Sequence, residues 1–219
     1  MDLIDGLNHY KNNSFYQRTL NLEEEGKTLL QLISAKNKNP SPPDLEKAKQ
    51  FLIAVEEWKA DCLSERMGDA DKNSSKNVWN AIHESIIATS DRTKLLAIMK
   101  LKGFGSSVDQ DTKQRRAKVA TSVLRFLWPE DWGVVDWRIA AMLGFLEKNQ
   151  WDIDKSIEEA RSTQAQEHRN LFDIIDELGA TEYNKKYRVL CTNKHPEITR
   201  AADADMAIFG LSLIAWPIR

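Results

Sequence analysis

Apolar residues recur at intervals of three and four along most of this chain, the spacing that places them on one face of an α-helix. The alternation of Val or Ile with polar residues that marks a half-buried strand never extends over a strand's length. The good helix formers Ala, Leu, Glu, Lys and Gln dominate instead. The pattern therefore predicts an all-α fold.

Capping residues and prolines indicate where helices begin and end. Ser41-Pro-Pro-Asp is expected to open one helix and Ser90-Asp91 another, and Asn21 is expected to open a third with acids in its first turn. Gly179 is expected to end a helix, and a polar surface loop is expected at 66–76. The expected helices lie near 21–35, 41–62, 79–87, 91–101, 136–146, 171–178, 183–190 and 197–215, with a short one from 152.

The length of 219 residues fits one large domain or two small lobes that share a cleft. We predict two helical lobes, 1–130 and 131–219, that divide at the turn 128–135 with a cleft between them. No run of 18 apolar residues is present, so no transmembrane helix is expected, and the N-terminus lacks the pattern of a signal peptide.

The two cysteines, Cys62 and Cys191, are too few for a disulfide framework or for the four thiolates of a cubane iron–sulfur cluster. A chain without a disulfide framework fits a cytoplasmic protein. The histidines are scattered without the spacing of a metal site, so neither a metal nor a cofactor is expected. The acids at 23–25, Asp203 and Asp205 are expected to be solvated charges or helix starts.

The basic residues are concentrated in one stretch. Between Arg92 and Lys118 the local balance is +6, and since the whole chain carries −2, the remainder carries −8. A basic patch on an acidic body attracts a polyanion at one place, although an ordinary solvated helix face would look the same by charge alone. The eight basic residues are Arg92, Lys94, Lys100, Lys102, Lys113, Arg115, Arg116 and Lys118.

The same stretch contains Leu101-Lys-Gly-Phe-Gly between two helical runs. Glycines two apart permit a tight turn with positive φ and let backbone N–H groups approach a phosphate. The alternative is a plain connection between helices. Further on, Asp136 precedes a helix, and Asp is among the commonest helix N-caps. Capping alone is therefore one interpretation of Asp136, and capping combined with catalysis is another.

The segments LKGFG, AKVATSVLRFLWP and VVDWR resemble the helix-hairpin-helix core of DNA glycosylases that use a catalytic aspartate. The likeness is to the divergent 8-oxoguanine-DNA-glycosylase-like branch, and it covers about 45 residues. RAADADMAIFGLS resembles the last helix of that family loosely, and the first 90 residues match no family pattern.

Several roles are implied by this resemblance. Gly103 and Gly105 fall on the hairpin, Lys118 falls on the lysine that forms a Schiff base in some members, and Asp136 falls on the catalytic aspartate. Arg138 stands where many members have histidine. In the family the lysine follows the second glycine almost at once.

Here residues 106–117 intervene between that glycine and Lys118. They predict an extended helix, an inserted basic loop, or a helix that starts early and moves Lys118 away from the cleft.

The resemblance implies a DNA N-glycosylase that binds duplex DNA and excises a damaged or modified base, with lyase activity through Lys118 as an addition. It also implies a cytoplasmic protein, nucleoid-associated if bacterial. Trp128, Trp132 and Trp137 are candidates for the base pocket or wedge, or for core packing. The expected DNA-binding residues are Lys102, Gly103, Phe104, Gly105, Lys113, Arg115, Arg116 and Arg138.

Two other functions remain open on the residues alone. One is a helix-hairpin-helix module that binds DNA but has lost excision. The other is a helical partner protein without nucleic acid, which the +6 stretch disfavours because a purely structural helix pair does not need it.

Overall fold

The computed structural model describes residues 1–37, 39–61, 68–105, 117–172, 175–193 and 197–217. Within these ranges the chain forms helices and no β-strand, which confirms the predicted all-α class. The helices are α1 (Leu3–Lys11), α2 (Tyr16–Lys36), α3 (Pro42–Asp61), the 3-10 turn η1 (Ala70–Lys72), α4 (Ser75–Ile87), α5 (Asp91–Met99), α6 (Lys118–Leu127), α7 (Trp137–Lys148), α8 (Ile153–Arg161), α9 (Ala165–Leu171), α10 (Glu177–Asn193) and α11 (Ala201–Ala215).

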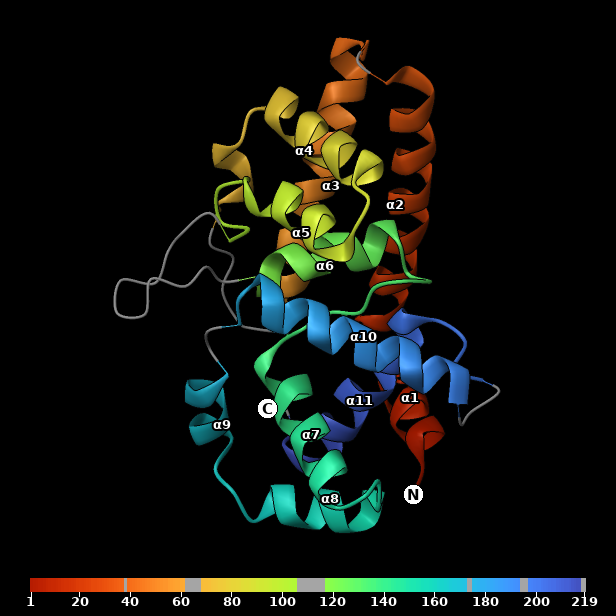
Figure 1. Ribbon diagram of the computed structural model, residues 1–219, viewed down its shortest axis with the longest axis vertical. Coiled ribbons are helices and arrows are strands. Elements are labelled where there is room, and N and C mark those ends of the chain that lie inside the picture. Colours follow the sequence, from red (N-terminus) through yellow and green to blue (C-terminus); the bar gives the residue numbers. More distant parts are fainter. Residues whose placement is uncertain (38, 62–67, 106–116, 173–174, 194–196, 218–219) are drawn as a thin grey trace.

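The helices gather in two groups along the long axis of the molecule (Figure 1). Helices α2 to α6 form one group, α1 and α7 to α11 form the other, and α10 reaches α5 across the boundary. The first helix packs closely on α11, where a side chain at Gly210 would overlap the backbone of Gly6. Helix α1 therefore lies with the C-terminal helices, whereas the division expected at residue 130 places it with the others.

Local sequence accounts for several helix starts. The Ser90 side chain accepts a hydrogen bond from the N–H of Thr93 at 3.2 Å in a capping box, as the Ser-Asp pair predicted. The Asp152 side chain caps α8 in the expected way, with the Lys155 N–H at 3.1 Å. Helix α3 begins at Pro42, directly after Ser41. Proline is tolerated there because an N–H in the first turn has no partner within the helix, so its loss costs no hydrogen bond.

Other boundaries differ from the predictions. Helix α2 begins at Tyr16 rather than Asn21, and α1 was not expected at all, although the Asp2 and Asp5 side chains form a capping box at its start. Gly179 does not end a helix. Its N–H donates to the Asp176 carboxylate at 2.8 Å, so this glycine lies in the first turn of α10.

The last helix begins at Ala201 rather than near residue 197. Part of the expected polar loop at 66–76 is the turn η1, in which Ala70 is completely buried. Among the described residues no helix is long and apolar enough to cross a membrane.

Candidate functional site

The segment that leads from α6 to Asp136 is held by side chains from three helices. The N–H groups of Gly133, Val134 and Val135 donate in turn to Asn184 Oδ1 at 3.2 Å, Asp205 Oδ2 at 2.5 Å and Thr121 Oγ1 at 3.0 Å. The Tyr187 hydroxyl donates to the carbonyl of Val134 at 2.6 Å. Three successive N–H groups and one carbonyl are thus bound by buried side chains, which fixes the direction in which the chain delivers Asp136.

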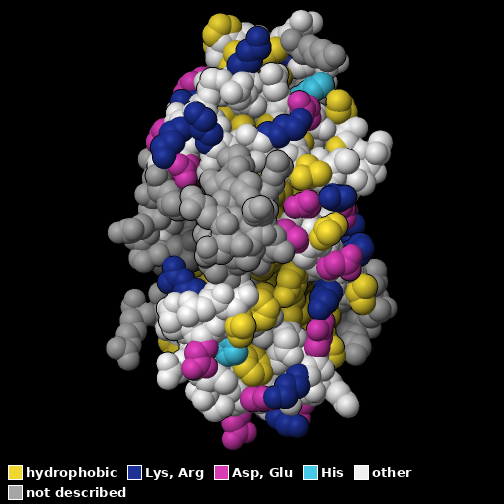
Figure 2. Space-filling view, turned by 60° about the vertical axis from the view of Figure 1, so that its left-hand side comes forward, with side chains coloured by type: hydrophobic (Ala, Val, Ile, Leu, Met, Phe, Trp, Pro, Cys, Tyr) yellow, Lys and Arg dark blue, Asp and Glu magenta, His cyan; other side chains and the backbone are white. Residues whose placement is uncertain are grey.

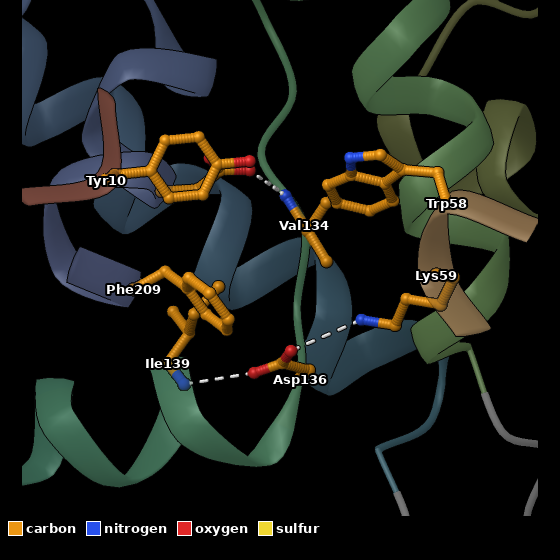
Figure 3. A pocket seen from close by; sticks show the side chains of 8 residues that line it. Tyr10, Trp58, Lys59, Val134, Asp136, Ile139 and Phe209 are labelled. Atoms are coloured by element: carbon orange, nitrogen blue, oxygen red, sulfur yellow. Dashed lines mark hydrogen bonds and ion pairs between the residues drawn. The ribbon is translucent and has the colours of Figure 1, made fainter. Parts of the chain in front are cut away.

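Asp136 is the N-cap of α7, as its position predicted. Its backbone is extended, and its Oδ1 accepts from the Ile139 N–H at 3.1 Å. Its Oδ2 lies 3.3 Å from Nζ of Lys59 on α3 (Figure 3). The two side chains are only 7% and 5% exposed, so this is a buried ion pair that joins the two helix groups.

A small cavity adjoins the ion pair. Its volume is about 20 Å³, close to the space that one water molecule needs. Figure 3 shows the Tyr10 and Phe209 rings on one side, Trp58 and Lys59 on the other, and Asp136 at the lower edge, where the Lys59 side chain points toward it. The lining residues are Tyr10, Trp58, Lys59, Val134, Asp136, Ile139, Asp205 and Phe209.

A second buried carboxylate, Asp205 of α11, lines the same cavity. Burial raises the pKa of its carboxyl to about 7, although the Arg125 guanidinium and the Val134 N–H both lower it. Arg125 is 1% exposed, with Nε 3.7 Å from Asp205 Oδ2 and Nη1 2.7 Å from Glu23 Oε1. These are charge contacts, because the orientation of the Arg125 N–H groups toward Glu23 is not that of hydrogen bonds.

The expectation that Asp205 and Glu23 are solvated is therefore wrong. Asp205 is 3% exposed, and the Glu23 side chain is 11% exposed and also contacts Arg200 at 2.8 Å. Helices α2, α6 and α11 meet at these charges, so the acids serve the helix packing behind the cavity. The signal in the sequence was an acid in an otherwise apolar helix, which indicates a buried polar group.

The glycine turn has the predicted backbone. Gly103 and Gly105 have φ values of +80° and +108°, which favour glycine. The Asn73 side chain accepts from the Lys102 N–H at 2.9 Å and donates to the Lys102 carbonyl at 3.1 Å, which fixes the turn from the side of α4. Phe104 is completely buried, so its ring belongs to the core and cannot contact DNA in this conformation.

Most of the described basic residues near this turn have partners. Arg92 pairs with Glu177 at 3.2 Å, Lys100 pairs with Glu84, and Lys94 lies 4.6 Å from the centre of the Trp128 ring. Lys102 is exposed beside a hollow of about 430 Å³ between α4 and the turn. On the face that Figure 2 shows, Lys and Arg side chains are interspersed with Asp and Glu. Lys113, Arg115 and Arg116 lie outside the described residues.

The other predicted site residues fall around α6 and α7. Lys118 is the first residue of α6 and is half-buried, and its carbonyl accepts from the Thr121 hydroxyl at 2.7 Å. Because Thr121 also binds the Val135 N–H, the start of α6 lies next to the segment that carries Asp136. Arg138 donates to the Trp216 carbonyl at 2.6 Å and stacks on the Trp137 ring at 4.8 Å.

The three tryptophan candidates differ in exposure. Trp132 is fully buried, so its ring packs in the core, and its Nε1 has no hydrogen-bond partner among the residues that the structure describes. Trp137 is 8% exposed, and Trp128 is partly exposed at the end of α6. Trp128 is therefore the candidate whose ring is most accessible for a base or a wedge contact.

Sequence reasoning missed Lys59, Trp58 and Tyr10, which complete the cavity. Lys59 stands between Trp58 and Ala60 in an amphipathic helix, where nothing local distinguishes it from a surface lysine. Among the described residues, no group of three or more His, Cys, Asp or Glu side chains is placed to hold a metal ion. Comparisons of the chain with protein-family models, with curated proteins and with solved structures find no match.

Proposed function

We propose that this protein binds duplex DNA and cleaves the N-glycosidic bond of a damaged or modified base, with Asp136 as the catalytic carboxylate. The observation that carries the proposal is the setting of Asp136. Its carboxylate caps α7, is buried, is paired with an amine and lies at the edge of a cavity that fits one water. The helix-hairpin-helix resemblance supplies the substrate class, and the positive φ values of Gly103 and Gly105 are compatible with that motif.

Cleavage of a base from deoxyribose places positive charge on the sugar ring. A carboxylate near C1′ stabilises that charge, and its effect is larger in a buried site than in water. A carboxylate can also orient a water and accept its proton as the water oxygen attacks C1′. Asp136 has one oxygen committed to the helix cap, so Oδ2 is the oxygen that faces these tasks. Lyase chemistry through Lys118 remains an addition to this proposal.

The excision experiment uses Asp136→Asn. Asparagine is a good N-cap, so the variant keeps the start of α7 while it removes the negative charge. We expect loss of base release from duplexes that each contain one 8-oxoguanine, uracil or hypoxanthine, measured by strand cleavage at the resulting abasic site. The matched control is Asp152→Asn, because Asp152 caps α8 in the same way on the surface. Equal base release by wild type and Asp136→Asn would contradict the catalytic role.

A second candidate is a DNA-binding module without excision activity. Two observations favour it. The cavity is far too small for a nucleobase, and the Asp136 carboxylate is already paired with the Lys59 ammonium. The same duplexes separate the two candidates. Wild-type protein that binds duplex DNA with an affinity that falls steeply with salt, yet releases no base, supports the module. Absence of salt-dependent binding argues against both candidates.

A further inference from the structure

Lys59 is an amine in an unusual position for a lysine. It comes from the C-terminal part of α3, in the helix group opposite to α7, and it is 4% exposed. Lysine is almost never fully buried unless it is paired, and here the partner is the carboxylate to which the catalytic role is given. Figure 3 shows the Lys59 side chain extended toward Asp136 across the edge of the cavity.

The distance between the two groups constrains what reaches them. Lys59 Nζ lies 3.3 Å from Asp136 Oδ2, which is hydrogen-bond contact. An opening that brings the sugar C1′ to the Asp136 carboxylate while the ion pair stays together therefore brings C1′ within reach of the Lys59 nitrogen as well. The carboxylate is a base in direct contact with the ammonium, so the Lys59–Asp136 pair has the arrangement of a nucleophile beside its proton acceptor.

We infer that Lys59 is the amine nucleophile of this site. The inference rests on the proposed function, because it concerns the same sugar carbon and the same carboxylate. It assigns the covalent chemistry to α3, whereas the resemblance assigned it to Lys118 at the start of α6.

The reaction needs no reagent beyond DNA and the two side chains. Asp136 accepts a proton from the Lys59 ammonium, which leaves a neutral amine with a free electron pair. The electron pair of the Lys59 nitrogen forms a bond to C1′ as the C1′–N bond to the base breaks. The departing base takes the proton from Asp136. One proton then moves from the lysine nitrogen to O4′ as the C1′–O4′ bond opens, and a protonated imine between Lys59 and the sugar remains.

The Lys59–Asp136 pair keeps the amine charged and in place while the site is closed. Trp58, Ile139 and Phe209 line the cavity beside the pair with apolar surface, which strengthens the attraction between the two charges. Lys118 is the rival amine, since it begins the helix that packs beside the Asp136 segment. The experiment must therefore identify which lysine is modified.

The test uses a duplex with a single abasic site, whose aldehyde condenses with an amine to an imine and water whichever base is normally excised. Sodium borohydride reduces that imine to a stable adduct, and mass spectrometry of the digested wild-type adduct locates the modified residue. We expect the adduct on Lys59. Lys59→Arg, which keeps a positive charge beside Asp136 but cannot form an imine, is expected to lose the adduct. Lys49→Arg, on the same helix and outside the cavity, is expected to retain it.

The outcomes separate this inference from the proposed function. An adduct mapped to Lys118, or its loss in Lys118→Arg with retention in Lys59→Arg, overturns the role of Lys59. Base release by wild type without any adduct also overturns it and leaves water-mediated excision by Asp136 standing. Absence of both base release and adduct overturns the two together. If Lys59→Arg fails to fold, as judged by circular dichroism, the mapped residue of the wild-type adduct decides.

Discussion

The glycine turn at 101–105 and the segment that ends at Asp136 belong to one sequence motif, but they are stabilised in different ways. The turn depends on backbone conformations that glycine adopts without strain, and Lys102 at its tip is exposed. The segment depends on buried side chains from α3, α6, α10 and α11, the most distant of which, Lys59, is 77 residues from Asp136 in the chain.

The difference indicates which part of the motif tolerates change. A turn made by local backbone geometry can be altered at the surface without effect on the core. A segment whose N–H groups are bound by buried polar side chains cannot, because each lost partner leaves a buried donor or charge unsatisfied. The turn therefore tolerates change at its exposed tip, Lys102, whereas the segment that ends at Asp136 does not.

The largest expected effect is at the ion pair. Lys59→Met conserves much of the side-chain volume but leaves the Asp136 carboxylate buried without a cation, which costs about 3–5 kcal/mol of unfolding free energy. Urea unfolding measures the loss. The control Lys49→Met, on the same helix but with its ammonium hydrogen-bonded to the Asp71 carbonyl near the surface, is expected to stay within about 0.5 kcal/mol of wild type.

Removal of both charges separates charge from packing. The double variant Lys59→Met with Asp136→Asn keeps the α7 cap and leaves neither group charged, so it is expected to recover part of the stability lost in Lys59→Met. A double variant less stable than Lys59→Met would show that the pair stabilises the fold by contacts other than the charge interaction.

A smaller effect is expected at Asp205, which lines the same cavity and accepts a hydrogen bond from the Val134 N–H. Its pKa in the folded protein is about 7, above the ordinary 3.8. The folded state therefore holds a proton that the unfolded state has already released, and stability falls as pH rises through this window. The fall attributable to Asp205 is about 3 kcal/mol between about pH 5 and pH 8.

Asp205→Asn tests this assignment because it is neutral at every pH and can still accept from the Val134 N–H. As pH rises from about 5 to about 8, the wild type is expected to lose more unfolding free energy than the variant. Asp152→Asn, an exposed cap, serves as the control for a change of carboxylate alone. A wild-type minus variant difference that is flat with pH would contradict a raised pKa at Asp205.

The sequence predicted what local physics determines. The all-α class follows from periodicity, and the caps at Ser90, Asp136 and Asp152 follow from side chains that accept the N–H three residues on. The positive φ at Gly103 follows from its place between two helices. The start of α2 was missed because its N-cap, Phe15, makes no side-chain hydrogen bond to the helix. The role of Gly179 was missed because its N–H donates to Asp176 at a helix start, although glycine more often ends helices.

The site itself could be predicted only in part. The resemblance of the segment VVDWR made Asp136 a candidate, but its partner Lys59 is brought to it by the packing of α3 against α6. Nothing in the residues around Lys59 records that contact. Asp205 looked like one of many surface acids, and its burial depends on α11 lying in the core between α1, α7 and α10.

The smallest stability effect that sharpens the comparison is in the turn. Gly103→Ala introduces a side chain at φ +80°, which costs about 1–2 kcal/mol, and the new Cβ would overlap the Asp69 side chain, so Asp69 must move. Gly68→Ala is the matched control, because Gly68 has φ +66° and no atom of the described residues lies within 4 Å of the place its Cβ would take. We expect Gly103→Ala to lose more unfolding free energy than Gly68→Ala, and both to lose less than Lys59→Met. Equal losses of unfolding free energy at the two glycines would mean that the Asp69 side chain moves aside without cost and that backbone conformation alone determines the turn. A loss in Gly103→Ala as large as in Lys59→Met would remove the distinction between a local turn and a segment fixed by the core.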